Sequence, residues 1–308
     1  MKNWAKCIKV LVLGFFVAVF YIVSRKIANP YKQALLLNME LEKKVTDRTI
    51  ELKEINKKVM DSIDYAKRMQ ESILPSGDEL KSIFREHFVI WRPRDVVGGD
   101  FYWVREIGET VILAVGDCTG HGVPGSLMTM TVNAVLYNIV TGINKDDPEI
   151  ILRELDKLLK QALNKGLKSD TTDDGLDIAI CCIKNKSRIS YAGANISLYI
   201  KREQELKVCK GYKKGVGYHG TVLPDGLTNT VLPVKEGDVF ILTSDGFIHQ
   251  NGGNKNYPFG RKRFYNLIQN SSALSMEAMK TEFESALQEY MKDEPQRDDI
   301  VVLAFMVK

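Results

Sequence analysis

Histidine is scarce in this sequence, and its scarcity argues against a class of hydrolase. Only four histidines occur among 308 residues, and no two of them have the short spacing that zinc sites use. A zinc hydrolase or a histidine-rich binuclear phosphoesterase is therefore not indicated. His87, His219 and His249 are interpreted as ordinary surface or hydrogen-bonded residues.

Cysteine is also rare and follows no disulfide-like spacing. The five cysteines are odd in number: Cys7, Cys118, Cys181, Cys182 and Cys209. A disulfide-rich extracellular scaffold is thereby excluded, and a reducing compartment such as the cytosol fits best.

Acidic residues are missing from the N-terminus. Residues 1–26 contain five lysines and arginines and no acid, whereas the formal net charge of the whole chain is only +4. Residues 27–308 therefore carry a net charge of −1. Because they also lack a basic platform with interleaved aromatic residues, they give no reason to expect a nucleic acid as partner.

An apolar run lies within this basic N-terminus. Residues 10–23 are uninterrupted, and 4–23 give about 20 residues, roughly the length of a membrane-spanning helix. A cleaved signal peptide has a similar pattern, and a peripheral helix is a third alternative. Residues 24–28 lack a small-x-small cleavage site, so we expect an uncleaved membrane anchor over 1–26.

Orientation in the membrane follows less directly, because lysines flank both ends of the apolar run. Arg25, Lys26 and Lys32, together with the pattern of reduced cysteines, favour a cytoplasmic body. The expectation is a single-pass protein of the inner (cytoplasmic) membrane.

Proline and glycine are absent between residues 31 and 74, which predicts one long helix. Its apolar residues recur with a period of seven, which is typical of a self-associating coiled coil and predicts a homodimer. An amphipathic helix that packs on its own domain is the alternative. The heptad positions are Leu41, Val45, Leu52, Ile55, Val59, Ala66, Met69 and Ile73, with polar breaks at Arg48 and Ser62.

Strand-like segments dominate after residue 85, and several are apolar on both faces, which requires cover on each side. Helical patterns interrupt them at 124–140, 148–163 and 275–290, the first two starting with proline. We therefore predict an α/β (α+β) domain over 76–308, with two packed sheets flanked by helices. The expected strands are 88–91, 101–104, 111–115, 176–183, 188–191, 197–201, 239–243 and 301–307.

Four acids stand at the ends of apolar strands: Asp100, Asp117, Asp245 and Asp298. Converging carboxylates repel one another, and a hard divalent cation relieves that repulsion. Sites made only of oxygen ligands suit Mg²⁺ or Mn²⁺. Neighbouring glycines allow the close backbone approach that a metal and a phosphate require.

Several motifs resemble the SpoIIE-like branch of the metal-dependent PPM serine/threonine phosphatases. They occur in family order from about residue 62 to the end of the chain. The motifs are YAKRMQ (65–70) with ILP (73–75), VGGDFYW (97–103), GDCTGHGVPG (116–125), DGLDIA (174–179), YAGAN (191–195), TSDGF (243–247) and RDDI (297–300).

The resemblance implies a β-sandwich flanked by helices and the hydrolysis of phosphoserine or phosphothreonine on a protein. Asp100, Asp117, Asp245 and Asp298 match the metal-binding acids of the family, and the backbone carbonyl of Cys118 matches a further ligand. Two Mn²⁺ or Mg²⁺ ions would activate a bridging hydroxide that attacks phosphorus without a covalent enzyme intermediate. Asp100 and Asp117 are thus also expected to be catalytic.

Other residues near these motifs have open roles. Asp177 is a candidate for a further acid near the site, and the resemblance favours Asp298 over Asp299 as ligand. His121 is expected either to donate a proton or to stabilise its loop by a hydrogen bond. Arg92 and Arg94 either clamp the substrate phosphate or are solvated strand residues.

The sequence departs from the family pattern at three places. Gly98 replaces a common serine, His249 stands where an acid often occurs, and residues 214–217 replace a Pro-Ile-Gly turn. None of these changes removes an expected metal ligand. They affect the expected fit of the substrate more than the expected chemistry.

These observations predict a membrane-anchored signalling phosphatase in which the helix over 31–74 pairs two catalytic domains. Its expected substrate is a phosphorylated regulator, for example an anti-sigma-factor antagonist. The alternative is a non-catalytic coiled-coil scaffold with a relic phosphatase fold. Retention of all four acids argues against that alternative.

Overall fold

The computed structural model describes residues 2–142, 146–163, 173–224, 229–271 and 275–308. The chain divides into two compact units, Met1–Ser62 and Ile63–Lys308, which are described separately. The first unit consists of helix, and the second contains the sheets and the remaining helices.

A single helix, α1 (Lys2–Ile73), supplies the whole first unit and the start of the second. It continues through Pro30, so no break in the helix separates the expected anchor from the expected coiled coil. Every side chain described between residues 4 and 62 is exposed, including the apolar run and the heptad positions. By length and composition, two helices of the described chain are apolar enough to cross a membrane, the N-terminal part of α1 and α3 (Gly122–Thr141).

Ten strands of the second unit form two five-stranded antiparallel sheets. One sheet has the order β1-β12-β9-β6-β7 and the other β2-β3-β4-β5-β8. A short hairpin of β10 (Asn251–Gly252) and β11 (Tyr257–Pro258) lies outside both. The bounds are β1 (Phe84–Arg92), β2 (Asp100–Ile107), β3 (Thr110–Cys118), β4 (Leu176–Lys184), β5 (Arg188–Ala194), β6 (Leu198–Arg202), β7 (Glu205–Cys209), β8 (Thr230–Pro233), β9 (Val239–Thr243) and β12 (Ile300–Val307).

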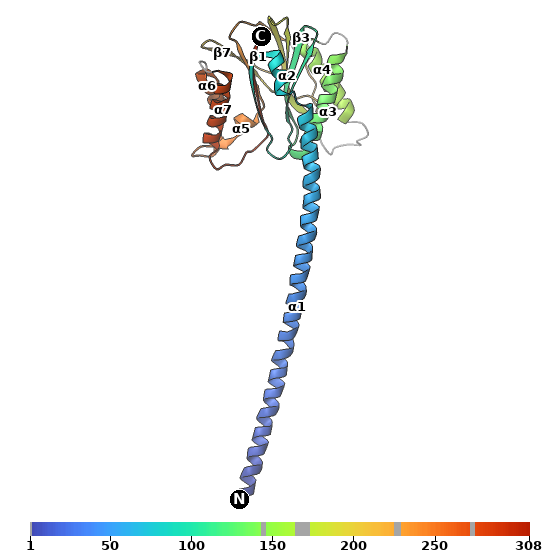
Figure 1. Cartoon of the computed structure of the whole chain (residues 1–308), viewed down its shortest axis with the longest axis vertical. Coiled ribbons are helices and arrows are strands. Elements are labelled where there is room, and N and C mark those ends of the chain that lie inside the picture. The colour runs from blue at the N-terminus through green and yellow to red at the C-terminus, as the bar shows by residue number, and fades with distance from the viewer. Residues whose placement is uncertain (1, 143–145, 164–172, 225–228, 272–274) are drawn as a thin grey trace. The chain divides into compact units, whose positions relative to one another are not determined.

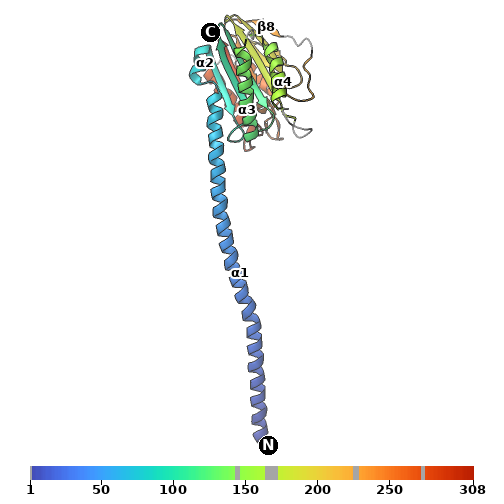
Figure 2. The same ribbon diagram turned by 90° about the vertical axis from the view of Figure 1, so that its right-hand side faces the viewer.

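Helices cover both outer faces of the paired sheets, as predicted. Figure 1 shows α3 and α4 on one side of the sheets and α6 and α7 on the other. In Figure 2, α3 and α4 lie in front of their sheet. The bounds are α2 (Gly77–Ile83), α4 (Pro148–Leu163), α5 (Gly246–His249), α6 (Arg261–Asn270) and α7 (Met276–Met291).

The apolar side chains form three clusters that correspond to the spaces between these layers. Along β3, Ile112 and Ala114 belong to the cluster that includes residues of α3 and α4. Leu113 and Val115 belong to the cluster between the two sheets. Because neighbouring side chains of a strand point to opposite faces, a central strand with both faces buried must be apolar throughout.

The sequence pattern predicted the long elements better than the short ones. Helix α4 has the predicted bounds, whereas α3 begins two residues before Pro124, with His121 as its N-cap residue. The strands β7 and β8 and the helices α2 and α6 were missed. They are short, and α6 buries only Phe264, Leu267 and Ile268.

Candidate active site

Three acids lie side by side at one end of the sheet that contains β3. Asp100 begins β2 and is paired in register with Asp117 near the end of β3. Asp117 is paired in turn with Asp177 on β4. The antiparallel pairing thus brings together carboxylates that are up to 77 positions apart in the sequence.

The second sheet brings further acids to the same end of the sandwich. Asp245 follows β9, and Asp298 precedes β12, which is the neighbour of β9. Ser244 links the two sheets, since its hydroxyl donates to Oδ2 of Asp100 at 2.5 Å and accepts from the Val301 amide at 3.0 Å. The acids from the two sheets therefore belong to one site.

Burial and mutual repulsion shift the pKa values of two of these carboxyl groups upward. Burial raises the pKa of Asp100 well above its usual value, and the charges of Asp299, Asp298 and Asp245 raise it further. Burial also raises the pKa of Asp117, with added repulsion first from Asp100. The neighbouring acids therefore oppose ionisation of Asp100 and Asp117.

In this structure, no three His, Cys, Asp or Glu side chains of the described chain are grouped so that they could hold one metal ion. Several acids instead accept hydrogen bonds from protein groups. Asp245 contacts Nδ1 of His249 at 2.9 Å, and Asp177 accepts from Asn195 at 2.8 Å. The donor set still fits a hard divalent cation, because it consists of oxygens whose mutual repulsion a cation would relieve.

Asp299 differs from Asp298 in what it contacts. Its two carboxylate oxygens accept hydrogen bonds from the backbone amides of Arg94 and Gly99, each at 2.6 Å. Asp299 is only 3% exposed, whereas Asp298 lines an open hollow beside Asp117. Asp299 therefore holds both ends of the loop that leads to Asp100, and Asp298 is the one available to a ligand.

Glycine is required where this loop meets the end of β3. A Cβ on Gly99 would lie 2.6 Å from the carbonyl oxygen of Gly120 and 2.8 Å from that of Cys118. Gly120 itself has a φ of +86°, a left-handed conformation that glycine adopts without strain. Burial raises the pKa of the Cys118 thiol, so its thiolate form is disfavoured. The backbone carbonyl of Cys118, and not its sulfur, is therefore the atom available as a metal ligand.

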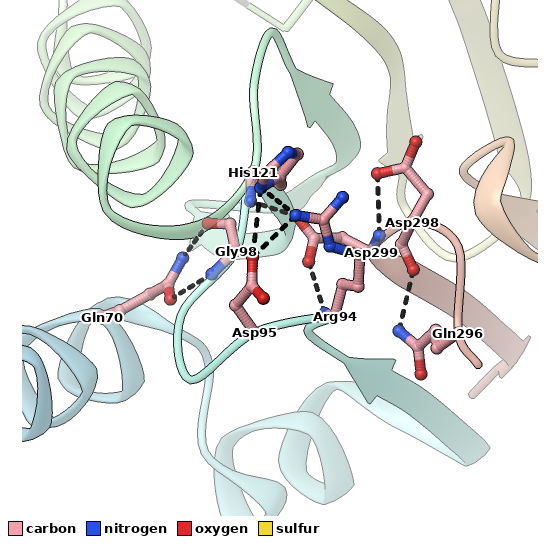
Figure 3. A network of polar contacts seen from close by, with 9 residues as sticks. Gln70, Arg94, Asp95, Gly98, His121, Gln296, Asp298 and Asp299 are labelled. Carbon is pink, nitrogen blue, oxygen red and sulfur yellow. Dashed lines mark hydrogen bonds and ion pairs between the residues drawn. The ribbon is translucent and has the colours of Figure 1, made fainter.

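Gln70 clamps the same loop from the last turns of α1. It is fully buried, and its amide donates to the Gly98 carbonyl at 2.7 Å and accepts from the Gly98 amide at 3.2 Å (Figure 3). Gln70 belongs to the YAKRMQ motif, but no role was predicted for it from the sequence. Gln70 lies off the heptad positions, so periodicity gave no signal for its burial.

A hollow of about 210 Å³ lies next to the acids. Tyr218 is in its wall, and its hydroxyl contacts the Thr119 hydroxyl at 3.1 Å. Tyr218 was not predicted from the sequence; it directly follows residues 214–217, which depart from the family pattern. The lining residues are Asp117, Cys118, Thr119, Gly120, His121, Asp177, Tyr218 and Asp298.

His121 lines this hollow and contacts two side chains of the Asp100 loop. Asp95 and Arg94 both approach its Nδ1 atom (Figure 3). Arg92 ends β1, and among the described residues its guanidinium makes no hydrogen bond or ion pair. Of the two arginines suggested for phosphate binding, only Arg94 is therefore connected to the polar network of the hollow.

Comparison with known proteins agrees with this geometry. A family model described as Stage II sporulation protein E (SpoIIE) matches residues 107–308. The chain belongs to the SpoIIE family. The SiaA PP2C domain of Pseudomonas aeruginosa is 34% identical, with a TM-score of 0.73, over a match covering 82% of this chain and 98% of that one. The predicted family, fold class and serine/threonine phosphatase class are thereby confirmed.

Two more distant structures share the fold. The phosphatase domain of SpoIIE from Bacillus subtilis, solved with a fragment of its regulatory domain, is 17% identical over 72% of this chain and 63% of that one, with a TM-score of 0.55. The RsbU and RsbW domains from Mycobacterium tuberculosis are 16% identical over 73% and 61%, with a TM-score of 0.54. No curated protein matches the chain.

The clamp by Gln70 leads to a first prediction. Gln70→Ala removes both hydrogen bonds to Gly98, and Gln70→Glu removes the one donated to the Gly98 carbonyl, so each loosens the loop that positions Asp100. We expect phosphatase activity, or the apparent affinity for Mn²⁺, to fall about 10–100-fold, as for other residues that orient ligands. Titrating the activity of the full chain in detergent with Mn²⁺ measures this. Glu71→Gln, on the exposed face of the same helix turn, is the control.

The crowded carboxylates lead to a second prediction, on pH. The pKa values of Asp100 and Asp117 are higher in the folded protein than the roughly 3.9 of an unfolded aspartate, so the folded state binds more protons than the unfolded state. Their contribution to stability is full below about pH 4 and is lost as the pH rises through the folded values. In chelator, the unfolding temperature of the full chain should fall with rising pH, and Asp100→Asn should flatten that fall. Equal slopes for both proteins would contradict this explanation.

Proposed function

We propose that this protein is a metal-dependent phosphatase that releases phosphate from phosphoserine or phosphothreonine on a signalling protein. The observation that carries the proposal is the meeting of Asp100, Asp117 and Asp177 from one sheet with Asp245 and Asp298 from the other. Membership of the SpoIIE family supports the reaction class.

The proposed metal ligands are the carboxylates of Asp100, Asp117, Asp245 and Asp298 and the backbone carbonyl of Cys118. Oxygen donors of this kind favour Mn²⁺ or Mg²⁺ over softer ions. When bound, such ions lower the pKa of a coordinated water and screen the charge that develops on the phosphoryl oxygens. The proposed number of ions, two, rests on the resemblance to the metal-dependent PPM phosphatases.

Residues around the hollow would bind and orient the substrate. Ser244 fixes the Asp100 carboxylate by its 2.5 Å hydrogen bond, and Asn195 fixes Asp177. Arg94 is proposed to bind the substrate phosphate, with Arg92 as a weaker candidate. His121, in the wall of the hollow, is proposed to donate a proton to the oxygen of the leaving serine or threonine.

The substrate is proposed to be a phosphorylated regulatory protein, such as an anti-sigma-factor antagonist. This proposal is supported by structurally similar proteins that have regulatory roles, one of which is described as a cell fate determinant. The alternative of a non-catalytic scaffold is less favoured, because all the proposed ligand acids are present and meet at one end of the sandwich.

We also propose that residues 1–26 anchor the protein in the cytoplasmic membrane, that 31–74 form a parallel coiled coil and that 76–308 form the cytoplasmic catalytic domain. The apolar N-terminal part of α1 and the exposed heptad residues support these assignments. Resistance of the membrane-bound protein to extraction by alkaline carbonate tests the anchor, and release into the supernatant would overturn it.

The coiled coil leads to a third prediction. Ile55 and Val59 are each about half exposed and lie on the heptad seam, so pairing of two chains would bury them. The full chain in detergent should sediment as a dimer, and Ile55→Asp with Val59→Asp should shift it to monomer. Lys53→Asp and Lys57→Asp, on the outer face of the helix, should leave the dimer intact. A monomeric unmodified chain would contradict the proposal.

The metal site leads to a fourth prediction. With Mn²⁺, the full chain should release phosphate from a phosphoserine peptide, and a chelator should abolish that release. Asp117→Ala should lower the rate of phosphate release at least about 100-fold, because the proposed metal site loses one of its ligand carboxylates. Asp78→Ala, at a fully solvated position on α2, is the control. Activity that survives Asp117→Ala would show that the site assignment is wrong.

A further inference from the structure

Two side chains of the Asp100 loop compete for one atom of His121. The guanidinium of Arg94 contacts Nδ1 of His121, and Oδ2 of Asp95 lies 3.1 Å from the same nitrogen (Figure 3). Arg94 and Asp95 are also paired with each other at 3.0 Å. A hydrogen-bond donor, the Arg94 guanidinium, and an acceptor, the Asp95 carboxylate, are thus both within reach of a single ring nitrogen.

These two contacts require opposite states of the imidazole. A ring nitrogen either carries a proton and donates, or has a lone pair and accepts. Nδ1 accepts when Arg94 is its partner and donates when Asp95 is its partner. The partner of Nδ1 therefore decides whether His121 holds a proton there, and the other nitrogen, Nε2, remains for a ligand in the hollow.

Arg94 is the partner that a substrate would remove. A guanidinium binds phosphate through two parallel hydrogen bonds, which an imidazole nitrogen does not match. The Arg94 backbone amide is held by Asp299, so its side chain can turn while its backbone stays in place. Asp95 and His121 are each about half exposed, at 48% and 51%, which leaves both free to adjust.

We propose that Asp95 is a positioning residue, which takes over Nδ1 of His121 when the substrate phosphate draws Arg94 away. This inference rests on the proposed function. It adds that phosphate binding itself creates the proton donor: with Nδ1–H held by Asp95, the imidazolium presents Nε2–H to the leaving oxygen.

The proton balance of the step is complete. Water adds its oxygen to phosphorus, and the bond from phosphorus to the leaving oxygen breaks. The electron pair stays on the leaving oxygen, which takes the Nε2 proton and departs as an alcohol. The proton released by the attacking water passes to solvent, from which His121 is recharged. Burial alone would raise the pKa of Asp95, but hydrogen bonds from Arg94 and His121 hold it below its usual value, so Asp95 remains an acceptor.

Aryl phosphates that differ in their leaving group test this inference in the full chain in detergent with Mn²⁺. Phenolate needs a proton to leave, whereas p-nitrophenolate leaves without one. Asp95→Asn should therefore lower kcat for phenyl phosphate at least about tenfold, less than the roughly 100-fold or more expected for loss of the proton donor itself, and kcat for p-nitrophenyl phosphate less than about threefold. A purely structural role would slow both substrates equally.

Two further comparisons sharpen the result. Asp95→Asn should have no added effect on phenyl phosphate in a His121→Gln background, because the two residues act as one unit. Asp146→Asn removes a carboxylate of similar exposure, paired with Lys184 away from the hollow, and should change neither substrate. Additive losses for Asp95→Asn and His121→Gln would overturn the inference.

The exchange at Nδ1 is tested through Arg94. Arg94→Ala should raise KM for both aryl phosphates about equally without making kcat more dependent on the leaving group, because Asp95 then holds Nδ1 permanently. An unchanged KM would show that Arg94 does not leave His121 for phosphate. If the unmodified chain releases phosphate neither from the aryl phosphates nor from a phosphoserine peptide, the proposed function itself fails. If it does, and Asp95→Asn slows both substrates alike, only the present inference fails.

Discussion

Electrostatic repulsion among buried carboxylates is the constraint on which the site depends. Asp100 and Asp117 face each other across two paired strands, and acids of the second sheet add to the same field. Bringing such groups together costs free energy unless protons or cations neutralise them. The antiparallel sheets, with apolar residues on both faces of β3, provide enough buried area to hold the acids in place.

The loop before Asp100, residues 94–99, contains two glycines but is fixed by several hydrogen bonds. Asp299 accepts from the amides at its two ends, and Gln70 satisfies the carbonyl and amide of Gly98. Since these partners are themselves buried, the loop has few ways to relax. The position of Asp100 is therefore coupled to the last turns of α1, to the start of β12 and, through Arg94 and Asp95, to His121.

This coupling connects the end of a helix to the candidate site. Gln70 belongs to the last turns of α1, which lie in the same compact unit as the sheets. Gln70 holds both the carbonyl and the amide of Gly98, so the end of α1 and the loop before Asp100 are fixed to each other.

The sequence alone determined the long elements and the identity of the acids. An apolar strand with an acid and a glycine at its end is a local pattern, so Asp100, Asp117, Asp245 and Asp298 were predicted from the sequence, and α4 was predicted with its observed bounds. Motif order also identified the family. These features depend on residues that are neighbours in the chain.

Tertiary structure alone decided which side chains hold and complete the site. Gln70 reaches Gly98 over 28 positions, His121 reaches Asp95 over 26, and Asp299 reaches Gly99 over 200. The sequence around Gln70, His121 and Asp299 has no local pattern that would indicate these contacts. A long-range hydrogen bond depends on how sheets and helices pack, and residue spacing carries no record of that packing.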